Sequence, residues 1–442
     1  MSIRTPLSRM FSATRRLEST LLTAVRSIFN PVLILTLLCS ALLTTACNSK
    51  GSSAPPPVGG ISVVAGENRA TISWVADPGV EYWLFYAPAS SISTTNWNSL
   101  PSSYAIVKAV SPQIVTGLVN DTTYAFTLNG RINGGPGGSG TPSVATVPRM
   151  AGNSWSAASA IGANDLRAVM SGATTAATVN TPAGIMYVAA GANGTMYSSS
   201  DAMSWTPINY TMTKNLYGAA YTGVYMVVGE SGTILYSTDA VTWATETSGT
   251  TRDLYAIASN NVNLSVAVGA AGTILYSGDG KTWYKAANSA TTNDLQHVVY
   301  GTNGTWVAVG DGGTIVKSTD GSNWQLASSG TVANLKGVSF GYSDSTLLTT
   351  TFVAVGASGT VLASADGTSW TVQTLPTAST LNAVSYGLQF AAVGDNGVIF
   401  TSKNGTSWVA QTSNSLSNLY GIVHSAAGFA AVGAAGTNLV AQ

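Results

Sequence analysis

Residues 254–283 read LYAIASNNVNLSVAVGAAGTILYSGDGKTW, and this stretch decides the fold. A leucine opens it, a run of small apolar residues ends at Gly269, and a polar turn precedes Trp283. Short runs rich in Val, Ile and Tyr that are bounded by Gly, Asn, Asp and Ser are typical of antiparallel hairpins. The stretch therefore predicts four short strands, at residues 254–257, 265–268, 273–276 and 283–285.

Three landmarks of this unit recur seven times along the chain. The tryptophans are Trp155, Trp205, Trp243, Trp283, Trp324, Trp370 and Trp408. The opening leucines are Leu166, Leu216, Leu254, Leu295, Leu335, Leu381 and Leu419. The glycines that end the apolar runs are Gly191, Gly229, Gly269, Gly310, Gly356, Gly394 and Gly433. Successive tryptophans are 38 to 50 residues apart, and such a period with several short strands per unit predicts an all-β fold, with a seven-bladed β-propeller at residues 151–442.

The two ends of the repeat region complement each other. Trp155 has no turn motif before it, and the sequence ends at Gln442, just after the third strand of the seventh unit. If the strand of Trp155 supplies the fourth strand of the last blade, pairing of the two ends removes the exposed strand edges. We therefore expect a ring that is closed by its N-terminal and C-terminal strands.

The turn before six of the tryptophans resembles the Asp-box of sialidase-like and other propellers. It reads Ser-x-Asp-Gly-x-x-Trp, with alanine in place of glycine at positions 202 and 240 and asparagine in place of aspartate at position 404. In such a turn a carboxylate or amide accepts backbone N–H groups, and glycine tolerates positive φ. The carboxylates could instead bind a metal, but each lies in a separate blade, so a structural role is favoured for Asp201, Asp239, Asp279, Asp320, Asp366 and Asn404.

The composition argues against nucleic-acid binding. Only 8% of the residues are charged, and without residues 1–46 the chain has 13 basic and 17 acidic residues, a net charge of −4. Nucleic-acid binding needs a basic stripe, which is absent from the sequence. We therefore expect no nucleic-acid partner, and we identify no cofactor and no metal site.

Residues 1–46 resemble the signal peptide of a bacterial lipoprotein. Five arginines precede an apolar run at residues 31–43, and Leu43-Thr44-Thr45-Ala46 leads to Cys47. Thr44 stands where such signals usually have leucine, and the alternative is ordinary cleavage that leaves a free thiol. The resemblance implies lipidation of Cys47 and attachment to the membrane, in the bacterial cell envelope. Asn48 after the cysteine favours the outer membrane.

Residues 47–60 are rich in Ser, Gly and Pro and predict a flexible linker after the lipidated cysteine. Residues 61–148 then show the alternating pattern of short strands and resemble a fibronectin type III domain. Trp74 matches the buried tryptophan of that family, and Leu118 with Tyr124 matches its tyrosine corner. The resemblance implies a sandwich that serves as a spacer, with a binding role as the alternative.

The propeller region is poor in the residue types that catalysis needs. A sialidase grips the carboxylate of its substrate with three arginines, whereas this region has only Arg167 and Arg252. Its histidines, His297 and His424, lie outside any nucleophile motif, so we expect both to be structural. The sequence therefore favours a protein that is not an enzyme.

Polar side chains recur directly before the opening leucines, and at three positions acids follow the strand-ending glycines. In a four-stranded blade both places lie on the face opposite the Asp-box turns. These side chains are turn-formers, a binding surface or catalytic groups; a glycosidase using two of Glu230, Asp311 and Asp395 is the enzymatic alternative. The candidate binding residues are Asp165, Arg167, Tyr217, Glu230, Arg252, Asp253, Tyr255, Asp294, Asp311, Lys336, Asp395 and Tyr420.

The whole repeat region resembles the seven-bladed propellers of photosystem II assembly factors, through stretches such as Val268-Gly269-Ala270-Ala271-Gly272-Thr273-Ile274-Leu275. That resemblance implies a non-enzymatic platform, although the arginine-rich patch of the photosynthetic members is missing. We therefore expect an envelope-anchored binding or scaffold lipoprotein whose propeller recognises a protein or glycan. A purely structural surface protein is a further option.

Overall fold

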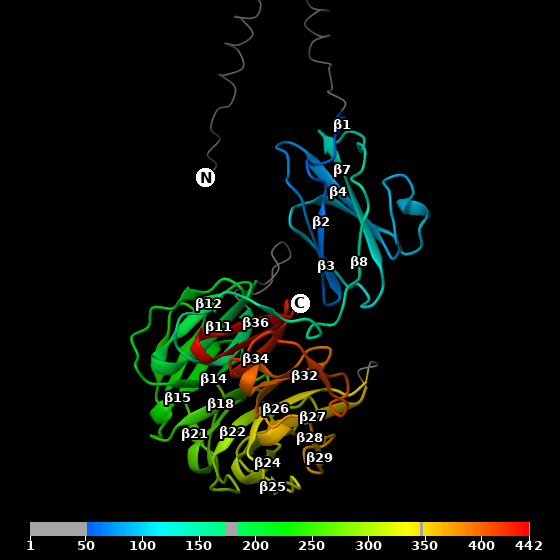
Figure 1. Cartoon of the computed structure of the whole chain (residues 1–442). Coiled ribbons are helices and arrows are strands. Elements are labelled where there is room, and N and C mark those ends of the chain that lie inside the picture. The colour runs from blue at the N-terminus through cyan, green and yellow to red at the C-terminus, as the bar shows by residue number, and fades with distance from the viewer. Residues whose placement is uncertain (1–50, 174–183, 345–347, 442) are drawn as a thin grey trace, which may run out of the picture. The chain divides into compact units, whose positions relative to one another are not determined.

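The computed structural model describes residues 51–173, 184–344 and 348–441 (Figure 1). The expected signal peptide and Cys47 lie outside these residues. Two compact units divide the chain: one contains residues 51–63, 72–113 and 124–145, and the other contains 64–71, 114–123 and the residues from 146 onward. Strands account for nearly all of the regular structure, as the sequence predicted.

Residues 52–146 form two antiparallel sheets. The larger has the order β1-β7-β4-β5, with β8 paired to β7, and the smaller has the order β2-β3-β6. The strands of the larger sheet are β1 (Ser52–Ala54), β4 (Glu81–Ala87), β5 (Tyr104–Ala109), β7 (Tyr124–Ile132) and β8 (Val144–Thr146). Those of the smaller sheet are β2 (Ser62–Gly66), β3 (Arg69–Ser73) and β6 (Gln113–Thr116), and one 3₁₀ turn, η1 (Trp97–Ser99), follows β4. Leu84 pairs with Leu128 at the buried centre of the larger sheet.

The repeat region forms seven four-stranded antiparallel sheets. Sheet one is β10 (Leu166–Ala173), β11 (Ile185–Gly191), β12 (Met196–Ser199) and β13 (Thr206–Pro207). Sheet two is β14 (Leu216–Tyr221), β15 (Tyr225–Gly229), β16 (Ile234–Ser237) and β17 (Ala244–Glu246). Sheet three is β18 (Leu254–Ser259), β19 (Ser265–Gly269), β20 (Thr273–Ser277) and β21 (Tyr284–Lys285). Sheet four is β22 (Leu295–Tyr300), β23 (Trp306–Gly310), β24 (Ile315–Ser318) and β25 (Gln325–Ala327).

The remaining three sheets repeat this pattern. Sheet five is β26 (Leu335–Tyr342), β27 (Thr350–Gly356), β28 (Thr360–Ser364) and β29 (Thr371–Thr374). Sheet six is β30 (Leu381–Tyr386), β31 (Phe390–Gly394), β32 (Ile399–Ser402) and β33 (Val409–Gln411). Sheet seven is β34 (Leu419–Ser425), β35 (Gly428–Gly433), β36 (Asn438–Ala441) and β9 (Ser156–Ala157). In sheet seven, therefore, the fourth strand comes from the N-terminal side of the region.

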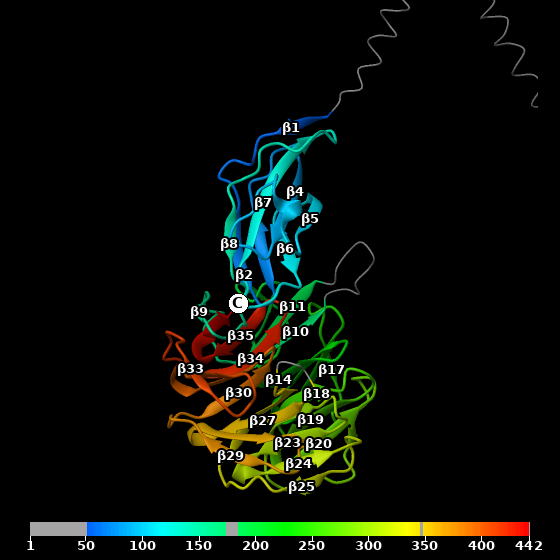
Figure 2. The same ribbon diagram turned by 90° about the vertical axis from the view of Figure 1, so that its right-hand side faces the viewer.

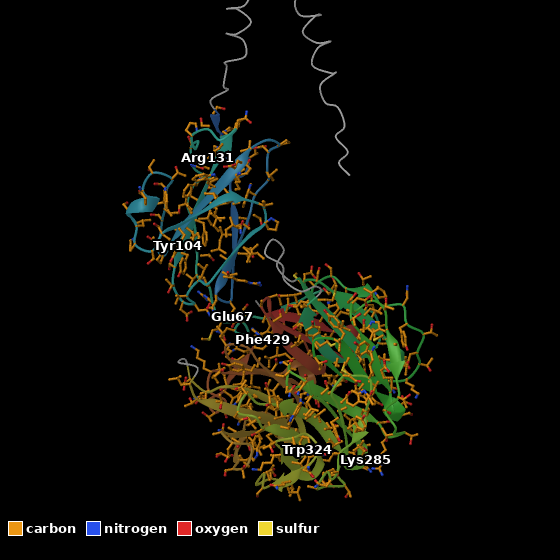
Figure 3. All side chains as sticks on the ribbon, turned by 180° about the vertical axis from the view of Figure 1, so that it is seen from behind. Glu67, Tyr104, Arg131, Lys285, Trp324 and Phe429 are labelled. Carbon is orange, nitrogen blue, oxygen red and sulfur yellow. The ribbon has the colours of Figure 1, made fainter. Side chains whose placement is uncertain are left out.

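The first strands of successive sheets lie side by side, as β10, β14 and β18 do in Figure 2. The first strand of sheet seven, β34, also contacts β10. Side chains of adjacent sheets share the core. Trp324 (Figure 3), at 2% exposure, packs with Val266 and Val268 of the preceding sheet. This is the arrangement of a β-propeller, in which apolar side chains fill the space between neighbouring sheets.

The expected turn chemistry is present after the third strand of six sheets. In sheet two, the Asp239 carboxylate accepts the backbone N–H groups of Val241 and Thr242 at 2.8 and 2.7 Å. The indole of Trp243 donates to the carbonyl oxygen of Ala240, at 3.2 Å. The N–H groups of Thr242 and Val241 lower the pKa of Asp239 to about 2, because they stabilise the ionised carboxylate.

A second turn, a single 3₁₀ turn that joins the second and third strands, is the same in all seven sheets. These turns are η2 (Ala192–Gly194), η3 (Glu230–Gly232), η4 (Ala270–Gly272), η5 (Asp311–Gly313), η6 (Ala357–Gly359), η7 (Asp395–Gly397) and η8 (Ala434–Gly436). The first residue of each turn donates its N–H to the carbonyl oxygen of the residue that precedes the opening leucine. In sheet four this bond runs from Asp311 to Asp294, at 3.0 Å. A methyl group on the intervening glycine, Gly310, would overlap that same oxygen. The close approach therefore explains why glycine ends each of these strands.

We predict that Gly310→Ala destabilises the protein by about 3 kcal/mol or more, because the added methyl group has no space beside the Asp294 carbonyl. Chemical denaturation followed by tryptophan fluorescence measures the effect. The matched control is Gly278→Ala, where an added Cβ would meet only the Asn263 oxygen, at 3.5 Å. Equal stability of the two variants would contradict the steric explanation.

We predict that Asp239→Ala costs about 1 kcal/mol through the loss of its N–H bonds, whereas Asp239→Asn costs less. The reason is that Asn404 makes the equivalent bonds to Thr406 and Ser407 at 3.0 and 2.8 Å. In the folded protein the pKa of Asp239 is lowered to about 2, whereas in the unfolded chain it is near 4. The stabilisation of the folded state by the ionised carboxylate is therefore complete above pH 4 and is lost as the pH falls through 2. Thermal melting at pH 7 and pH 2.5 measures this, and a wild type and asparagine variant with identical acid sensitivity would disprove it.

Candidate functional site

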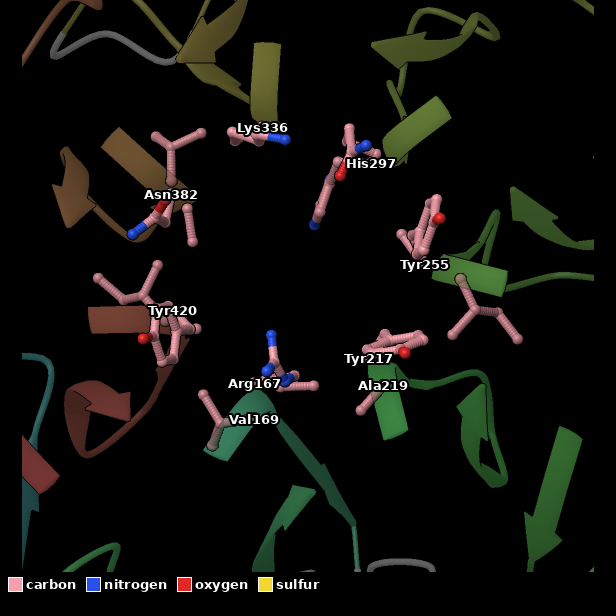
Figure 4. Close-up of a pocket in the computed structure, with 18 of the residues that line it drawn as sticks. Arg167, Val169, Tyr217, Ala219, Tyr255, His297, Lys336, Asn382 and Tyr420 are labelled. Atoms are coloured by element: carbon pink, nitrogen blue, oxygen red, sulfur yellow. The ribbon is translucent and has the colours of Figure 1, made fainter. Parts of the chain in front are cut away.

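A cavity of about 460 Å³ lies among the first strands of the seven sheets (Figure 4). Every sheet contributes side chains to its wall. Its volume falls in the range of about 300–1,000 Å³ that is usual for ligand pockets. This cavity is therefore the candidate functional site.

A β-bulge supplies the side chains at the mouth of the cavity. In sheet one, Leu166 pairs with Gly191 and Ala168 pairs with Ala190, so Arg167 is an extra residue without a partner in the ladder. The same register shift follows the opening leucine of every sheet. A bulge re-aims the extra side chain. The seven residues so placed, here called the rim residues, all line the cavity: Arg167, Tyr217, Tyr255, Gln296, Lys336, Asn382 and Tyr420.

The residue after each rim residue is small in six of the seven sheets. A Cβ on Gly218 would come within 2.7 Å of the Ala256 Cα atom, so adjacent first strands approach closely here. Further along the strands, the cavity wall is apolar and consists of Val169, Ala219, Ile257, Val384 and Ile422. The cavity thus combines a polar and aromatic mouth with an aliphatic interior.

Arg167 points into the cavity between two tyrosines (Figure 4). Its guanidinium carbon lies 5.8 Å from the centre of the Tyr217 ring and 5.7 Å from that of Tyr420, within the range of cation–π attraction. Its nearest carboxylate, that of Asp165, is 4.0 Å away. Within the described part of the chain the guanidinium donates no hydrogen bond, so its donors remain available.

Lys336 enters from the opposite side of the cavity (Figure 4), but its charge is compensated. Its amine lies 3.6 Å from Asp311, which also accepts the Gln296 amide at 3.3 Å. The Asn382 amide donates to Asp395, at 2.8 Å, and to the Leu419 carbonyl, at 2.9 Å. These contacts orient three rim residues with groups from their own or a neighbouring sheet.

The carboxylates that precede the opening leucines bind a turn of the preceding sheet. Asp253 accepts the N–H of Ser231 at 2.8 Å, and Asp294 accepts that of Ala271 at 2.8 Å. Asp165 does the same for Ala435 of sheet seven, at 3.0 Å. Asn215, Asn334 and Asn418 make the equivalent bonds to Asn193, Gly312 and Asn396. Each acid or amide therefore joins two adjacent sheets, a structural role that the sequence had left open beside binding and catalysis.

Two rim tyrosines lie beside these acids. The rings of Tyr217 and Tyr255 are 5.6 Å apart, and the Tyr255 hydroxyl lies 3.4 Å from Asp294. Burial, followed by the charges of Asp294 and Asp253, raises the pKa of Tyr255 to about 12. Burial also raises the pKa of Tyr217, so the hydroxyls of Tyr217 and Tyr255 stay protonated at neutral pH and can donate hydrogen bonds.

His297 replaces the small residue that follows the rim position in sheet four. It lies in the cavity wall, and within the described residues its Nδ1 atom has no hydrogen-bond partner. Burial lowers the pKa of His297 to about 4, and a hydrogen bond with the Val338 backbone opposes this only in part. His297 is therefore neutral at physiological pH.

Six of the twelve residues proposed from the sequence line the cavity: Arg167, Tyr217, Asp253, Tyr255, Lys336 and Tyr420. Asp165, Asp294, Asp311 and Asp395 instead bond to rim residues or turns around it. Glu230 accepts the backbone N–H and the side-chain amide of Asn215, both at 3.0 Å. Arg252 lines a separate groove with Lys214 and donates to the Ala271 carbonyl, at 2.8 Å. Sequence reasoning missed Gln296, Asn382 and His297, although each directly follows an opening leucine or its neighbour.

Among residues 51–173, 184–344 and 348–441, no group of three His, Cys, Asp or Glu side chains is arranged to hold a metal ion. In the same part of the chain, no helix has the length and apolar character needed to cross a membrane.

Residues 93–254 match the family model described as the DUF6242 beta propeller domain. Among solved structures, the chain is similar to YCF48 bound to a D1 peptide, at 16% identity and a TM-score of 0.52, over 65% of this chain and 94% of that one. It is also similar to YCF48 from Cyanidioschyzon merolae, at 14% identity and a TM-score of 0.51, over 65% of this chain and 98% of that one. A streptogramin B lyase is similar at 12% identity and a TM-score of 0.53, over 65% of this chain and 97% of that one. No curated protein matches. At these identities the likeness shows the fold, which is a β-propeller.

We predict that His297 makes stability pH-dependent. Its folded pKa of about 4 lies below the unfolded value near 6.5, so the unfolded chain binds more protons between these values. Stability should therefore fall as the pH is lowered through this window, by about 1–2 kcal/mol between pH 7 and pH 5, and less in His297→Gln. Chemical denaturation at both pH values tests this, and NMR titration of the ring reads its pKa directly. A ring that titrates near pH 6.5 would refute the prediction.

Proposed function

We propose that the propeller is a non-enzymatic binding platform, and that the cavity and its rim residues recognise a protein or glycan partner. The observation that carries this proposal is a difference between positions of the repeat. The opening leucine and the strand-ending glycine are identical in all seven sheets, whereas the rim position between them carries Arg, Tyr, Tyr, Gln, Lys, Asn and Tyr. Scaffold positions are constant and the position that faces the cavity varies, as expected where a repeat supplies specificity.

The character of the mouth supports recognition. Tyrosine and arginine are among the side chains most enriched in residues that dominate binding energy, and three tyrosines and one arginine are rim residues. The fold is also that of YCF48, which has been solved bound to a D1 peptide, so a propeller of this type can hold a polypeptide. This chain would use the same architecture with a different set of side chains at the mouth.

A catalytic role is less well supported. The three acids of the glycosidase alternative lie in sheets two, four and six, and each bonds to a different partner: Glu230 to Asn215, Asp311 to Gln296 and Lys336, and Asp395 to Asn382. A glycosidase needs two carboxyl groups that act on one bond. Their separate hydrogen-bonding favours structural roles.

The proposal includes the architecture around the site. Seven four-stranded sheets, the contact of β34 with β10, and the pairing of Leu439 with Ala157 support a seven-bladed ring closed by its two ends. Two antiparallel sheets over residues 52–146, with Trp74 packed edge-on against Tyr82, support a fibronectin type III-like spacer at residues 61–148. The Asp-box assignment is supported by the shared bonds of its six turns. The sequence around Cys47 supports a lipid anchor in the bacterial envelope, at the outer membrane.

We predict that the double variant Tyr217→Ala/Tyr255→Ala loses its partner, because it removes two adjacent aromatic side chains from the mouth. The full-length protein would be used to capture partners from detergent-solubilised envelope, with quantification by mass spectrometry. We expect a reduction of at least tenfold in the captured partner, since aromatic hot-spot residues each contribute about 2 kcal/mol or more.

The matched control is Tyr284→Ala, which removes a tyrosine that is 55% exposed on the outer strand β21. The control should capture the partner as the wild type does, and circular dichroism checks that all variants fold. Equal capture by the double variant would overturn the assignment of the cavity as the binding site.

A further inference from the structure

Arg167 differs from the other cations near the cavity. Lys336 is compensated by Asp311 at 3.6 Å, and Arg252 is bonded to a carbonyl in another groove. The Arg167 guanidinium, whose nearest carboxylate is that of Asp165 at 4.0 Å, instead lies near two tyrosine rings, with its carbon 5.8 and 5.7 Å from the ring centres, and within the described residues it donates no hydrogen bond. A planar guanidinium with open edge donors matches the two oxygens of a carboxylate or those of a phosphate.

The charges around the cavity affect a phosphate and a carboxylate differently. Six carboxylates surround the mouth, against the two cations Arg167 and Lys336: Asp165, Glu230, Asp253, Asp294, Asp311 and Asp395. A doubly charged phosphate group would be repelled more strongly by this ring than a singly charged group would be. Of these two anions, the singly charged carboxylate is therefore repelled less and fits the site better.

The remaining rim residues indicate the chemical class of the ligand to which the carboxylate belongs. The amide groups of Asn382 and Gln296 donate to Asp395 and Asp311, and within the described residues their carbonyl oxygens accept no hydrogen bond. Asp253 also lines the cavity, and three tyrosines offer hydroxyls and ring faces. This mouth is rich in acceptors, so it fits a ligand with several hydroxyl donors. An acidic side chain of a polypeptide brings a carboxylate but no such set of hydroxyls.

We propose that the cavity binds a uronate residue of an acidic glycan, with its carboxylate on Arg167 and its hydroxyls on the opposite rim. This inference rests on the proposed binding function and names the ligand class for the same site. Tyr217 and Tyr420 position the guanidinium, while Asn382, Gln296 and Asp253 accept hydrogen bonds from the sugar.

Isothermal titration calorimetry with the full chain tests the proposal. The probes are trisaccharides of galacturonate and of mannuronate, a neutral galactose trisaccharide and a hexaglutamate peptide. We expect at least one uronate to bind, the neutral sugar to bind at least tenfold more weakly, and the peptide not to compete. Arg167→Gln should weaken uronate binding by about tenfold to a hundredfold, the range for loss of a charged hydrogen bond, and Arg167→Lys by less.

The matched control is Lys285→Gln, which removes one positive charge from the exposed outer strand β21 (Figure 3) and should leave affinity within twofold. The proposal is overturned if neither uronate binds, if the neutral sugar binds equally well, if Arg167→Gln binds as the wild type does, or if hexaglutamate is preferred. If partner capture depends on Tyr217 and Tyr255 but neither uronate binds, the proposed binding function is retained and only the glycan ligand is rejected. Failure of both experiments would remove the cavity as a binding site.

Discussion

One backbone contact organises the propeller: the residue after each strand-ending glycine donates its N–H to the carbonyl oxygen of the residue before the opening leucine. The bond is 2.9 or 3.0 Å long in all seven sheets. It brings the second strand so close to the start of the first that only glycine fits between them. It also holds the leucine opposite that glycine, and the ladder resumes two residues later with one residue left over. The bulge, and with it the rim of the cavity, follows from this contact.

The same region joins neighbouring sheets. The residue that offers its carbonyl to its own sheet offers its side chain to the turn of the preceding one, as Asp253 does to Ser231. A carboxylate or amide at that position therefore serves two sheets at once. Thr380 is the exception, and there the turn of sheet five is held by the Ser379 carbonyl, which accepts the N–H of Gly359 at 3.0 Å. A backbone carbonyl thus takes the place of the side-chain acceptor, and the hydrogen bond between sheets five and six is retained.

The sequence predicted the strands well because their signal is local and repeated. The strands expected at 254–257 and 273–276 are β18 and β20, each extended by one or two residues. It was also informative about the rim, since five of the seven rim residues were selected as charged or aromatic neighbours of a leucine. Gln296 and Asn382 were missed because uncharged amides give no chemical signal, although alignment of the seven repeats would have found them. The bonds of Asp165, Asp253 and Asp294 could not be predicted, because each joins the acid to a turn of another sheet.

The separation of constant from variable positions has a physical basis. A residue in the ladder of the first strand pairs with a residue of the second strand, and its neighbours pack between two sheets, so a change there alters the core. The bulged residue has no partner in the ladder and projects into the cavity, so its identity is decoupled from the stability of the sheet. The bulge, which breaks the regular pairing, is thus the position at which seven nearly identical units can differ. A propeller built in this way can acquire a new combination of rim side chains while the backbone pairing within each sheet stays in place.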